Sequence, residues 1–172
     1  MEIIGSVYDY KNKNLGDCIL LQYTQSSTHD KSFYNLIYPK LTENELKQVC
    51  SSSFLFNRKL SDHLAYSDFK DRNSNELWVN SVYSNQQKKG LGTDLLKGIS
   101  MFANTTNQDI LSLSAFNHAV GFYEKLGFMA TGYKGKDTSD MTTKISQSKF
   151  ADFSQFKRNP IYSEIVAEVF SK

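Results

Sequence analysis

The sequence predicts a single α/β domain in which a mixed central sheet is flanked by helices. Segments of alternating or continuous apolar residues, typical of strands, recur along the chain, and a helical stripe of apolar residues stands between two of them. At 172 residues, with 40% hydrophobic and 22% charged residues, the chain fits one well-buried globular domain. No internal repeat, linker or low-complexity tract divides it, so residues 1–172 form one predicted unit.

The net charge and the cysteines restrict the partners that the sequence suggests. A net charge of +2 is too small to indicate a nucleic-acid groove or an anionic membrane surface. The first residues, MEIIGSVYDYKNKN, match neither a signal peptide nor a membrane span, because their short apolar run is soon broken. Cys18 and Cys50 are the only cysteines, and they lack the spacing of a metal site or a disulfide framework. We therefore expect a cytoplasmic protein that has no metal, nucleic-acid or membrane partner.

The N-terminal half begins with two segments that have the character of strands. EIIGSVYDY and CILLQYTQ flank the polar sequence KNKNLGD, a pattern that predicts a β-hairpin. The segment SFYNLIYPK fits either a strand or a helix. Thr42 and Glu45 have the spacing of a capping box and predict a helix that begins near Thr42. Residues 51–75 are polar and mixed, so no element is assigned to them.

From Glu76 onward the pattern becomes clearer. ELWVNSVYS predicts a buried strand that ends near Ser84. An apolar stripe then predicts a helix over about residues 90–103; its members are Leu91, Leu95, Ile99 and Phe102.

Four further segments complete the predicted domain. DILSLSA predicts a strand, NHAVGFYEKLG a short helix closed by Gly127, and FMATGY another strand. MTTKIS can pair with that last strand across residues 134–140. Pro160 predicts the start of a packing helix that has Ile161, Ile165 and Val169 on one face. A homodimer contact through this helix is left open.

Gly90 and Gly92 lie between the strand that starts at Glu76 and the following helix. The order strand, loop, helix, strand indicates a right-handed βαβ unit. A helix start presents unpaired N–H groups and the positive end of a dipole, so an anion such as a phosphate is the expected guest. Glycine allows the phosphate to approach the amides closely, and Lys88 and Lys89 add positive charge.

Three phosphate-binding patterns can be compared with this loop. A dinucleotide fingerprint needs a third glycine where this chain has Leu95, and a P-loop needs a terminal Gly-Lys-Ser/Thr, which is absent. The third pattern is Gln or Arg, two residues, Gly, one residue, and then Gly or Ala. The segment from Gln87 to Gly92 supplies that order.

This loop resembles the acyl-coenzyme A site of the Gcn5-related N-acetyltransferases, the GNAT family. A second segment, LSLSAFNHAVGFYEKLGF, is similar to the fifth strand and fourth helix of that family. The resemblance covers residues 76–145 and implies a GNAT-type fold, in which two parallel strands splay around acetyl-coenzyme A. The N-terminal half departs from it. The family runs strand, two helices and two strands before its glycine-loop strand, whereas this chain begins with a hairpin-like pair.

The resemblance implies which residues bind the cosubstrate acetyl-coenzyme A. The pantetheine arm would pair with residues 82–84, and the N–H of Val82 would bind the thioester oxygen. The pyrophosphate would bind the amides of residues 87–92. Asn117 would cap its helix and contact the coenzyme. The implied binding residues are Val82, Tyr83, Ser84, Gln87, Lys88, Lys89, Gly90, Leu91, Gly92, Thr93 and Asn117.

Two residues match catalytic positions of the family. Tyr123 matches the tyrosine that protonates the leaving thiolate, a role that suits a phenol with a pKa near 10; a core aromatic is the alternative. Glu76 lies fourteen residues before Gly90, where histone-acetylating members carry a glutamate base; a solvated acid is the alternative. Strand alternation would place Glu76 on one face with Trp78, Asn80 and Val82.

The function that this resemblance implies is direct transfer of an acetyl group to a primary amine in a ternary complex, without a covalent enzyme intermediate. The alternative is a non-catalytic GNAT-like module that binds acyl-coenzyme A or another protein. Ser112 and Ser114 have no recognisable His and Asp partners, and the histidines lack ligand spacing, so a serine nucleophile or a metal is not indicated. The acceptor, a protein or a small molecule, is not specified, although residues 51–75 and 134–140 would shape its site by family analogy.

Overall fold

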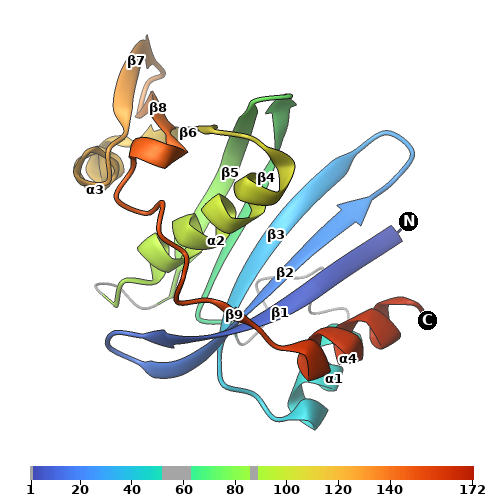
Figure 1. Cartoon of the computed structure of the whole chain (residues 1–172). Helices are drawn as coiled ribbons and strands as arrows, with labels where there is room; N and C mark the ends of the chain where they lie inside the picture. The colour runs from blue at the N-terminus through green and yellow to red at the C-terminus, as the bar shows by residue number, and fades with distance from the viewer. Residues whose placement is uncertain (1, 52–62, 86–88) are drawn as a thin grey trace.

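The computed structural model describes residues 2–51, 63–85 and 89–172. In this part of the chain nine strands form one mixed sheet with helices on both faces (Figure 1). The strands are β1 (Glu2–Asn12), β2 (Gly16–Ser26), β3 (Lys31–Pro39), β4 (Ala65–Asn73), β5 (Glu76–Ser84), β6 (Ile110–Phe116), β7 (Met129–Lys134), β8 (Thr138–Lys144) and β9 (Lys157–Arg158). The helices are α1 (Glu43–Ser51), α2 (Leu91–Thr106), α3 (Val120–Lys125) and α4 (Pro160–Phe170). The order β7-β8-β6-β5-β4-β3-β2-β1-β9 confirms the predicted mixed α/β class.

The predicted N-terminal hairpin is confirmed. β1 and β2 pair from Glu2 opposite Ser26 to Asn12 opposite Gly16. The Oδ1 of Asn12 accepts hydrogen bonds from the amides of Asn14 (2.8 Å) and Leu15 (2.9 Å), and these bonds close the turn. The segment SFYNLIYPK, which fitted a strand or a helix, lies in β3 and pairs with β2.

β4 is a strand that lies within the unassigned residues 51–75. Three of its side chains, Ala65, Ser67 and Phe69, are buried, and only Phe69 is large and apolar. Small and polar residues therefore hide the alternation on which a strand prediction depends. Residues 52–62 of the same segment lie outside the described residues.

α2 covers one face of the centre of the sheet. Its predicted stripe is confirmed, since Leu91, Leu95 and Ile99 are buried. The ring of Phe102 packs on those of Phe33 and Phe69, with centroid distances of 4.3 and 5.2 Å. Among the described helices none is long and apolar enough to cross a membrane.

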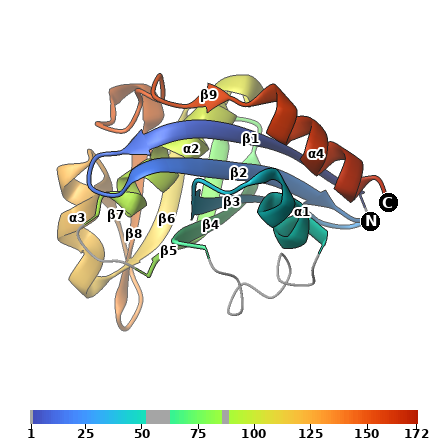
Figure 2. The ribbon, with the colours of Figure 1, turned by 90° about the horizontal axis from the view of Figure 1, so that it is seen from below.

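α1 and α4 cover the opposite face over β1 to β3, and Figure 2 shows them side by side at one end of the sheet. The predicted capping box begins α1. The amide of Glu45 donates to Oγ1 of Thr42 (3.2 Å), and the amide of Thr42 donates to Oε1 of Glu45 (3.1 Å). Two donors at the start of the helix are thereby satisfied.

α4 starts at Pro160 as predicted, but its buried face differs from the predicted one. Ile161 is 61% exposed, whereas Ile165 and Val166 are buried. The amide of Val7 donates a hydrogen bond to Oγ of Ser163 (3.0 Å), which turns the side of the helix that carries Ser163 toward β1. A buried serine therefore takes part in the packing face, and a purely apolar spacing rule does not detect it.

β5, α2 and β6 form the predicted unit with two parallel strands. β5 pairs with β6 only from Glu76 opposite Ile110 to Val79 opposite Leu113. Beyond these four pairs the strands separate, as the family resemblance implied. The start of α2 and the helix α3 lie at this separation (Figure 1).

A β-bulge at Asn80 changes which residues of β5 share a face. Asp68 pairs with Ser81 and Phe69 pairs with Val79, so Asn80 is an extra residue in β5. Val82 consequently packs against the α2 side, as Leu77 and Val79 do. The expectation that Val82 shares a face with Glu76 was wrong, because strict alternation does not hold across the bulge. We call the sheet face opposite α2 the far face; over β4 and β5 it carries Tyr66, Asp68, Lys70, Glu76, Trp78, Ser81 and Tyr83.

Candidate active site

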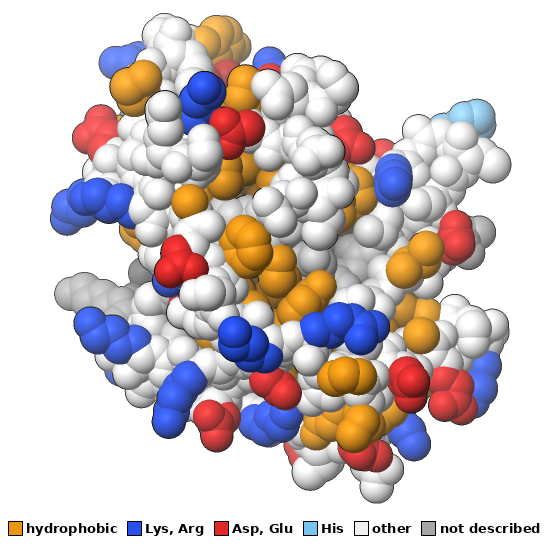
Figure 3. All heavy atoms as spheres, in the orientation of Figure 1, with side chains coloured by type: hydrophobic (Ala, Val, Ile, Leu, Met, Phe, Trp, Pro, Cys, Tyr) orange, Lys and Arg blue, Asp and Glu red, His pale blue; other side chains and the backbone are white. Residues whose placement is uncertain are grey.

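A cavity of about 410 Å³ lies where β5 and β6 separate. It is bounded by the end of β5, the first turn of α2 and the helix α3. Its described lining residues are Val82, Ser84, Lys89, Gly90, Leu91, Gly92, Thr93, His118, Ala119, Phe122 and Tyr123. Figure 3 shows the α2 side of the molecule, where apolar side chains gather at the centre of the face and basic side chains lie around them.

Gly90 occupies the N-cap position of α2 in a left-handed conformation, with φ 74° and ψ 8°. A residue with a Cβ atom is strained in this conformation. No side chain of the described residues caps this helix start, so the amides of its first turn have no side-chain acceptor, and the residues that carry them line the cavity. The geometry suits an anion at the positive end of the helix dipole.

Gly92 allows the loop to approach α3 closely. A Cβ atom at this position would lie 3.2 Å from Cζ of Phe122, closer than ordinary van der Waals contact. Glycine therefore keeps the cavity between the first turn of α2 and α3 at its present width. Lys89 supplies a positive charge to the described lining, while Gln87 and Lys88 lie outside the described residues.

Tyr123 contributes a phenol to the same cavity, although its side chain is 9% exposed. Its ring packs against Phe122 and Phe128, with centroid distances of 5.0 and 5.3 Å. Removal from water disfavours the phenolate and raises the pKa of Tyr123 above its ordinary value. Tyr123 is therefore a neutral hydroxyl group that can donate a proton.

A buried polar network lies under the glycine loop. Oδ2 of Asp94 accepts hydrogen bonds from Tyr10 (3.0 Å) and from Nδ2 of Asn12 (2.8 Å). The same Nδ2 lies 2.9 Å from the carbonyl oxygen of Lys89, so one amide group contacts both the loop and the helix. Burial raises the pKa of Asp94, and the hydrogen bonds from Asn12 and Tyr10 oppose this shift only in part.

Glu76 lies away from this cavity. It lines a second cavity, of about 690 Å³, between β5, β6 and the β7–β8 hairpin, together with Arg72, Trp78 and Tyr133. Its Oε2 lies 3.5 Å from Nη1 of Arg72, and its Oε1 accepts a hydrogen bond from Asn73 at 3.2 Å. The structure thus separates the two predicted catalytic residues into two cavities.

Two predicted binding residues are not brought into the glycine-loop cavity. Tyr83 is 49% exposed on the far face, where its ring contacts Tyr66. Asn117 is exposed and begins a turn of 3₁₀ helix that ends at Ala119, and no side chain caps that turn or α3. The expectation that Asn117 caps its helix was wrong, because Phe116 occupies the N-cap position.

Sequence reasoning did not assign His118, Ala119 and Phe122 to the lining. The close approach of Phe122 to Gly92 joins two segments that are distant in sequence, and neither segment reveals it alone. Asp94 and Asn12 were also missed. An acidic residue in the first turn of a helix is common without any ligand, so Asp94 carried no specific signal.

A family model described as an acetyltransferase (GNAT) domain matches residues 9–139. A search of curated proteins finds no match.

Two solved structures match part of the chain. One is PaiA N-acetyltransferase from Thermoplasma acidophilum in complex with coenzyme A, with 14% identity and a TM-score of 0.49 over 66% of this chain and 60% of that one. The other is Campylobacter jejuni N-acetyltransferase PseH, with 18% identity and a TM-score of 0.46 over 66% of this chain and 67% of that one. The chain thus spans less than two thirds of the Thermoplasma protein. The family model covers most of the length of this chain, and the chain therefore belongs to the GNAT acetyltransferase family.

Proposed function

We propose that this protein transfers the acetyl group of acetyl-coenzyme A to a primary amine by direct attack in a ternary complex. One observation carries the proposal. The glycine loop at the start of α2 and the hydroxyl-bearing Tyr123 line the same cavity, at the separation of the two parallel strands. An anion site and a proton donor thus lie together where a thioester could be held.

The cavity residues fit the coenzyme. The pyrophosphate would bind the amides at the start of α2, beside Lys89 and the hydroxyl group of Thr93. The pantetheine arm would lie along residues 82–84, where the strand has left its partner β6. The N–H of Val82 would donate to the thioester oxygen, on which negative charge develops during attack. Gly92 supports this placement, because a side chain there would narrow the cavity against Phe122.

Tyr123 would act as the general acid. The nitrogen of a neutral amine attacks the carbonyl carbon, a C–N bond forms, and the C–S bond breaks. The departing thiolate takes the proton of Tyr123, and the phenolate recovers a proton released from the nitrogen. Burial keeps this phenol neutral, so its proton is present when the thiolate leaves.

Glu76 would accept a proton from the amine only through intervening water. Val82 lies six positions after Glu76, about 20 Å along a strand at 3.3 Å per residue. Its carboxylate is also held by Arg72 and Asn73. An E76Q variant tests this role, and unchanged turnover at neutral pH would remove Glu76 from the mechanism.

The two cysteines give no support to an acetyl-enzyme intermediate. Both Cys18 and Cys50 are buried, and neither lines the cavity. Burial raises the pKa of Cys50 to about 12, so its thiolate is scarce at neutral pH. Direct attack is therefore the simpler route.

The test is a thiol-release assay with acetyl-coenzyme A and a panel of primary amines, run on the native protein and on a Gly90→Glu variant. We expect amine-dependent thiol release by the native protein and its loss in the variant, because glutamate strains the left-handed backbone at position 90 and adds a negative charge. Intact-mass analysis after incubation with acetyl-coenzyme A alone should show no acetyl adduct. Tight binding of acetyl-coenzyme A without any amine-dependent release would favour a non-catalytic module instead.

A further inference from the structure

We propose that Asp68, on the far face of the sheet, binds the ammonium group of the acceptor, and that the acceptor is a cationic primary alkylamine. This inference rests on the proposed acetyl transfer. It adds a binding residue and a charge class for the acceptor, neither of which the glycine loop or Tyr123 specifies.

The orientation of Asp68 follows from its neighbours on β4. Ala65 and Phe69 belong to the clusters that pack against α2. Tyr66 packs instead against the cluster under α1 and α4, on the far face. Since side chains alternate along a regular strand, Asp68 points to the same face as Tyr66. The coenzyme would approach from the α2 side and the acceptor from the far face.

The carboxylate of Asp68 has an unsatisfied oxygen. Its Oδ1 is buried and has no hydrogen-bond partner among the described residues. No Lys, Arg or His of the described chain lies within 4 Å of this carboxylate, whereas Arg72 and Glu76 form such a pair. A buried charged oxygen without a donor is unfavourable, and a cation that arrives with its own N–H groups would satisfy it. Both carboxylate oxygens of Glu76, in contrast, already have partners.

Along the strands, Asp68 also lies close to the position proposed for the thioester. It pairs with Ser81, which is adjacent both to the bulge residue Asn80 and to Val82. Residues paired across antiparallel strands have Cα atoms about 5 Å apart. Glu76 lies five residues before Ser81, about 16 Å along the strand. An ammonium held by Asp68 would therefore lie close to the backbone where the thioester oxygen is placed.

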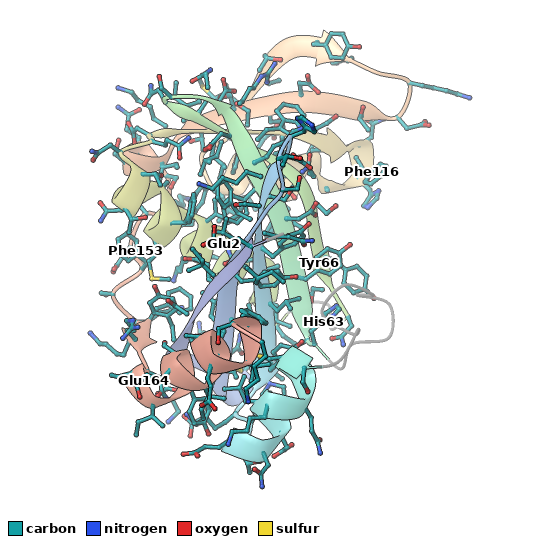
Figure 4. All side chains as sticks on the ribbon, turned by 90° about the vertical axis from the view of Figure 1, so that its right-hand side faces the viewer. Glu2, His63, Tyr66, Phe116, Phe153 and Glu164 are labelled. Atoms are coloured by element: carbon teal, nitrogen blue, oxygen red, sulfur yellow. The ribbon has the colours of Figure 1, made fainter. Side chains whose placement is uncertain are left out.

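Three tyrosines occupy neighbouring positions on the strands around Asp68. The rings of Tyr66 and Tyr83, two residues from Asp68 and Ser81 on the same face, have centroids 5.7 Å apart. Tyr34 is the partner of Asp68 on β3. Figure 4 shows Tyr66 near His63, and the two rings lie 5.3 Å apart, edge to face. Tyrosine faces attract cations, so a carboxylate among tyrosines suits an alkylammonium better than a neutral or acidic acceptor.

The test compares steady-state kinetics of the native protein and D68N with four probes: n-butylamine, tyramine, spermidine and Nα-acetyl-lysine amide. For the best substrate we expect KM to rise at least tenfold in D68N, while the Kd of acetyl-coenzyme A, measured by calorimetry, changes less than twofold. D68E should recover part of the loss. D71N is the matched control, because Asp71 lies on the same strand and its carboxylate bonds to Gln108, and its KM should be unchanged.

Thermal unfolding separates binding from a structural role. Because Asp68 carries an unpaired buried oxygen, D68N should unfold at the same temperature as the native protein or higher. A KM in D68N within twofold of the native value would overturn the inference. A protein that binds acetyl-coenzyme A but acetylates none of the four amines, or one that does not bind acetyl-coenzyme A, would refute the proposed acetyl transfer and this inference together.

Discussion

The side-chain amide of Asn12 lies 2.8 Å from Oδ2 of Asp94 and 2.9 Å from the carbonyl oxygen of Lys89. Asn12 ends β1, at the turn of the N-terminal hairpin. Lys89 belongs to the glycine loop, and Asp94 belongs to α2, the helix that follows this loop. Its Oδ1 also closes the turn of the hairpin. One side chain therefore joins the N-terminal hairpin to the proposed coenzyme site.

Replacing Asn12 with alanine should loosen the glycine loop. Asp94 would lose the hydrogen bond from Nδ2 of Asn12, which should reduce the free energy of unfolding by about 1–3 kcal/mol. We also expect a several-fold increase in the Kd of acetyl-coenzyme A. Urea unfolding and calorimetry check both effects, with N14A as the control because that side chain is exposed. Equal effects in both variants would contradict the role of Asn12.

Asp94 should make stability depend on pH. Burial raises its pKa in the folded state above the unfolded value, so folding favours the protonated carboxyl group. Its contribution to stability is thus present below the unfolded pKa, near 3.9, and is lost as pH rises through the folded pKa. The free energy of unfolding of the native protein, relative to D94N, should increase as pH is lowered from neutral toward the unfolded pKa, near 3.9. A difference in the free energy of unfolding between the two proteins that does not change between neutral pH and about pH 4 would contradict the prediction.

Tyr123→Phe should impair turnover without weakening coenzyme binding. Loss of a general acid lowers kcat by about 10² to 10⁴-fold, and the phenyl ring retains the packing of the buried tyrosine. Because the pKa of Tyr123 is raised, the native enzyme should show no loss of kcat from ionisation of this phenol below about pH 10. Steady-state rates across pH and calorimetric titration measure the two effects. A variant that keeps full turnover would exclude Tyr123 as the acid.

Thr42→Ala gives a variant whose effect should be structural alone. It removes the Oγ1 that accepts from the amide of Glu45, and should reduce the free energy of unfolding by about 1 kcal/mol. For a domain of this size the corresponding decrease in Tm is about 2–4 °C. The Kd of acetyl-coenzyme A should not change, because α1 lies at the end of the sheet away from the cavity. Calorimetry that shows weaker coenzyme binding would mean that the two ends of the sheet are coupled.

The parts of the fold that the sequence predicts are those with a local pattern. The α2 stripe, the capping box of Thr42 and the hairpin turn each depend on residues that are near one another in sequence. β4 escaped prediction because Ala65 and Ser67 face the core without a large apolar side chain. Likewise, the bulge at Asn80 depends on its pairing with another strand and has no local signature.

The candidate site shows the same division. Gly90, Gly92 and Tyr123 could be selected because the family pattern marks them, and they line one cavity. Asp94, Phe122 and Asp68 could not, since their contacts or their missing partners arise only when distant segments meet. The side of the strand on which Val82 lies was also mispredicted, because a single extra residue reverses the alternation.

The central claim is that acetyl-coenzyme A binds at the start of α2, between β5 and α3. A calorimetric titration of acetyl-coenzyme A into the native protein, Gly92→Val and Gly121→Ala tests it most directly. The valine side chain of the first variant would collide with Phe122, whereas a Cβ at position 121 meets no atom within 4 Å. We predict micromolar binding to the native protein and to Gly121→Ala, and at least tenfold weaker binding to Gly92→Val. Equal affinity in all three, or no binding to the native protein, would contradict the account.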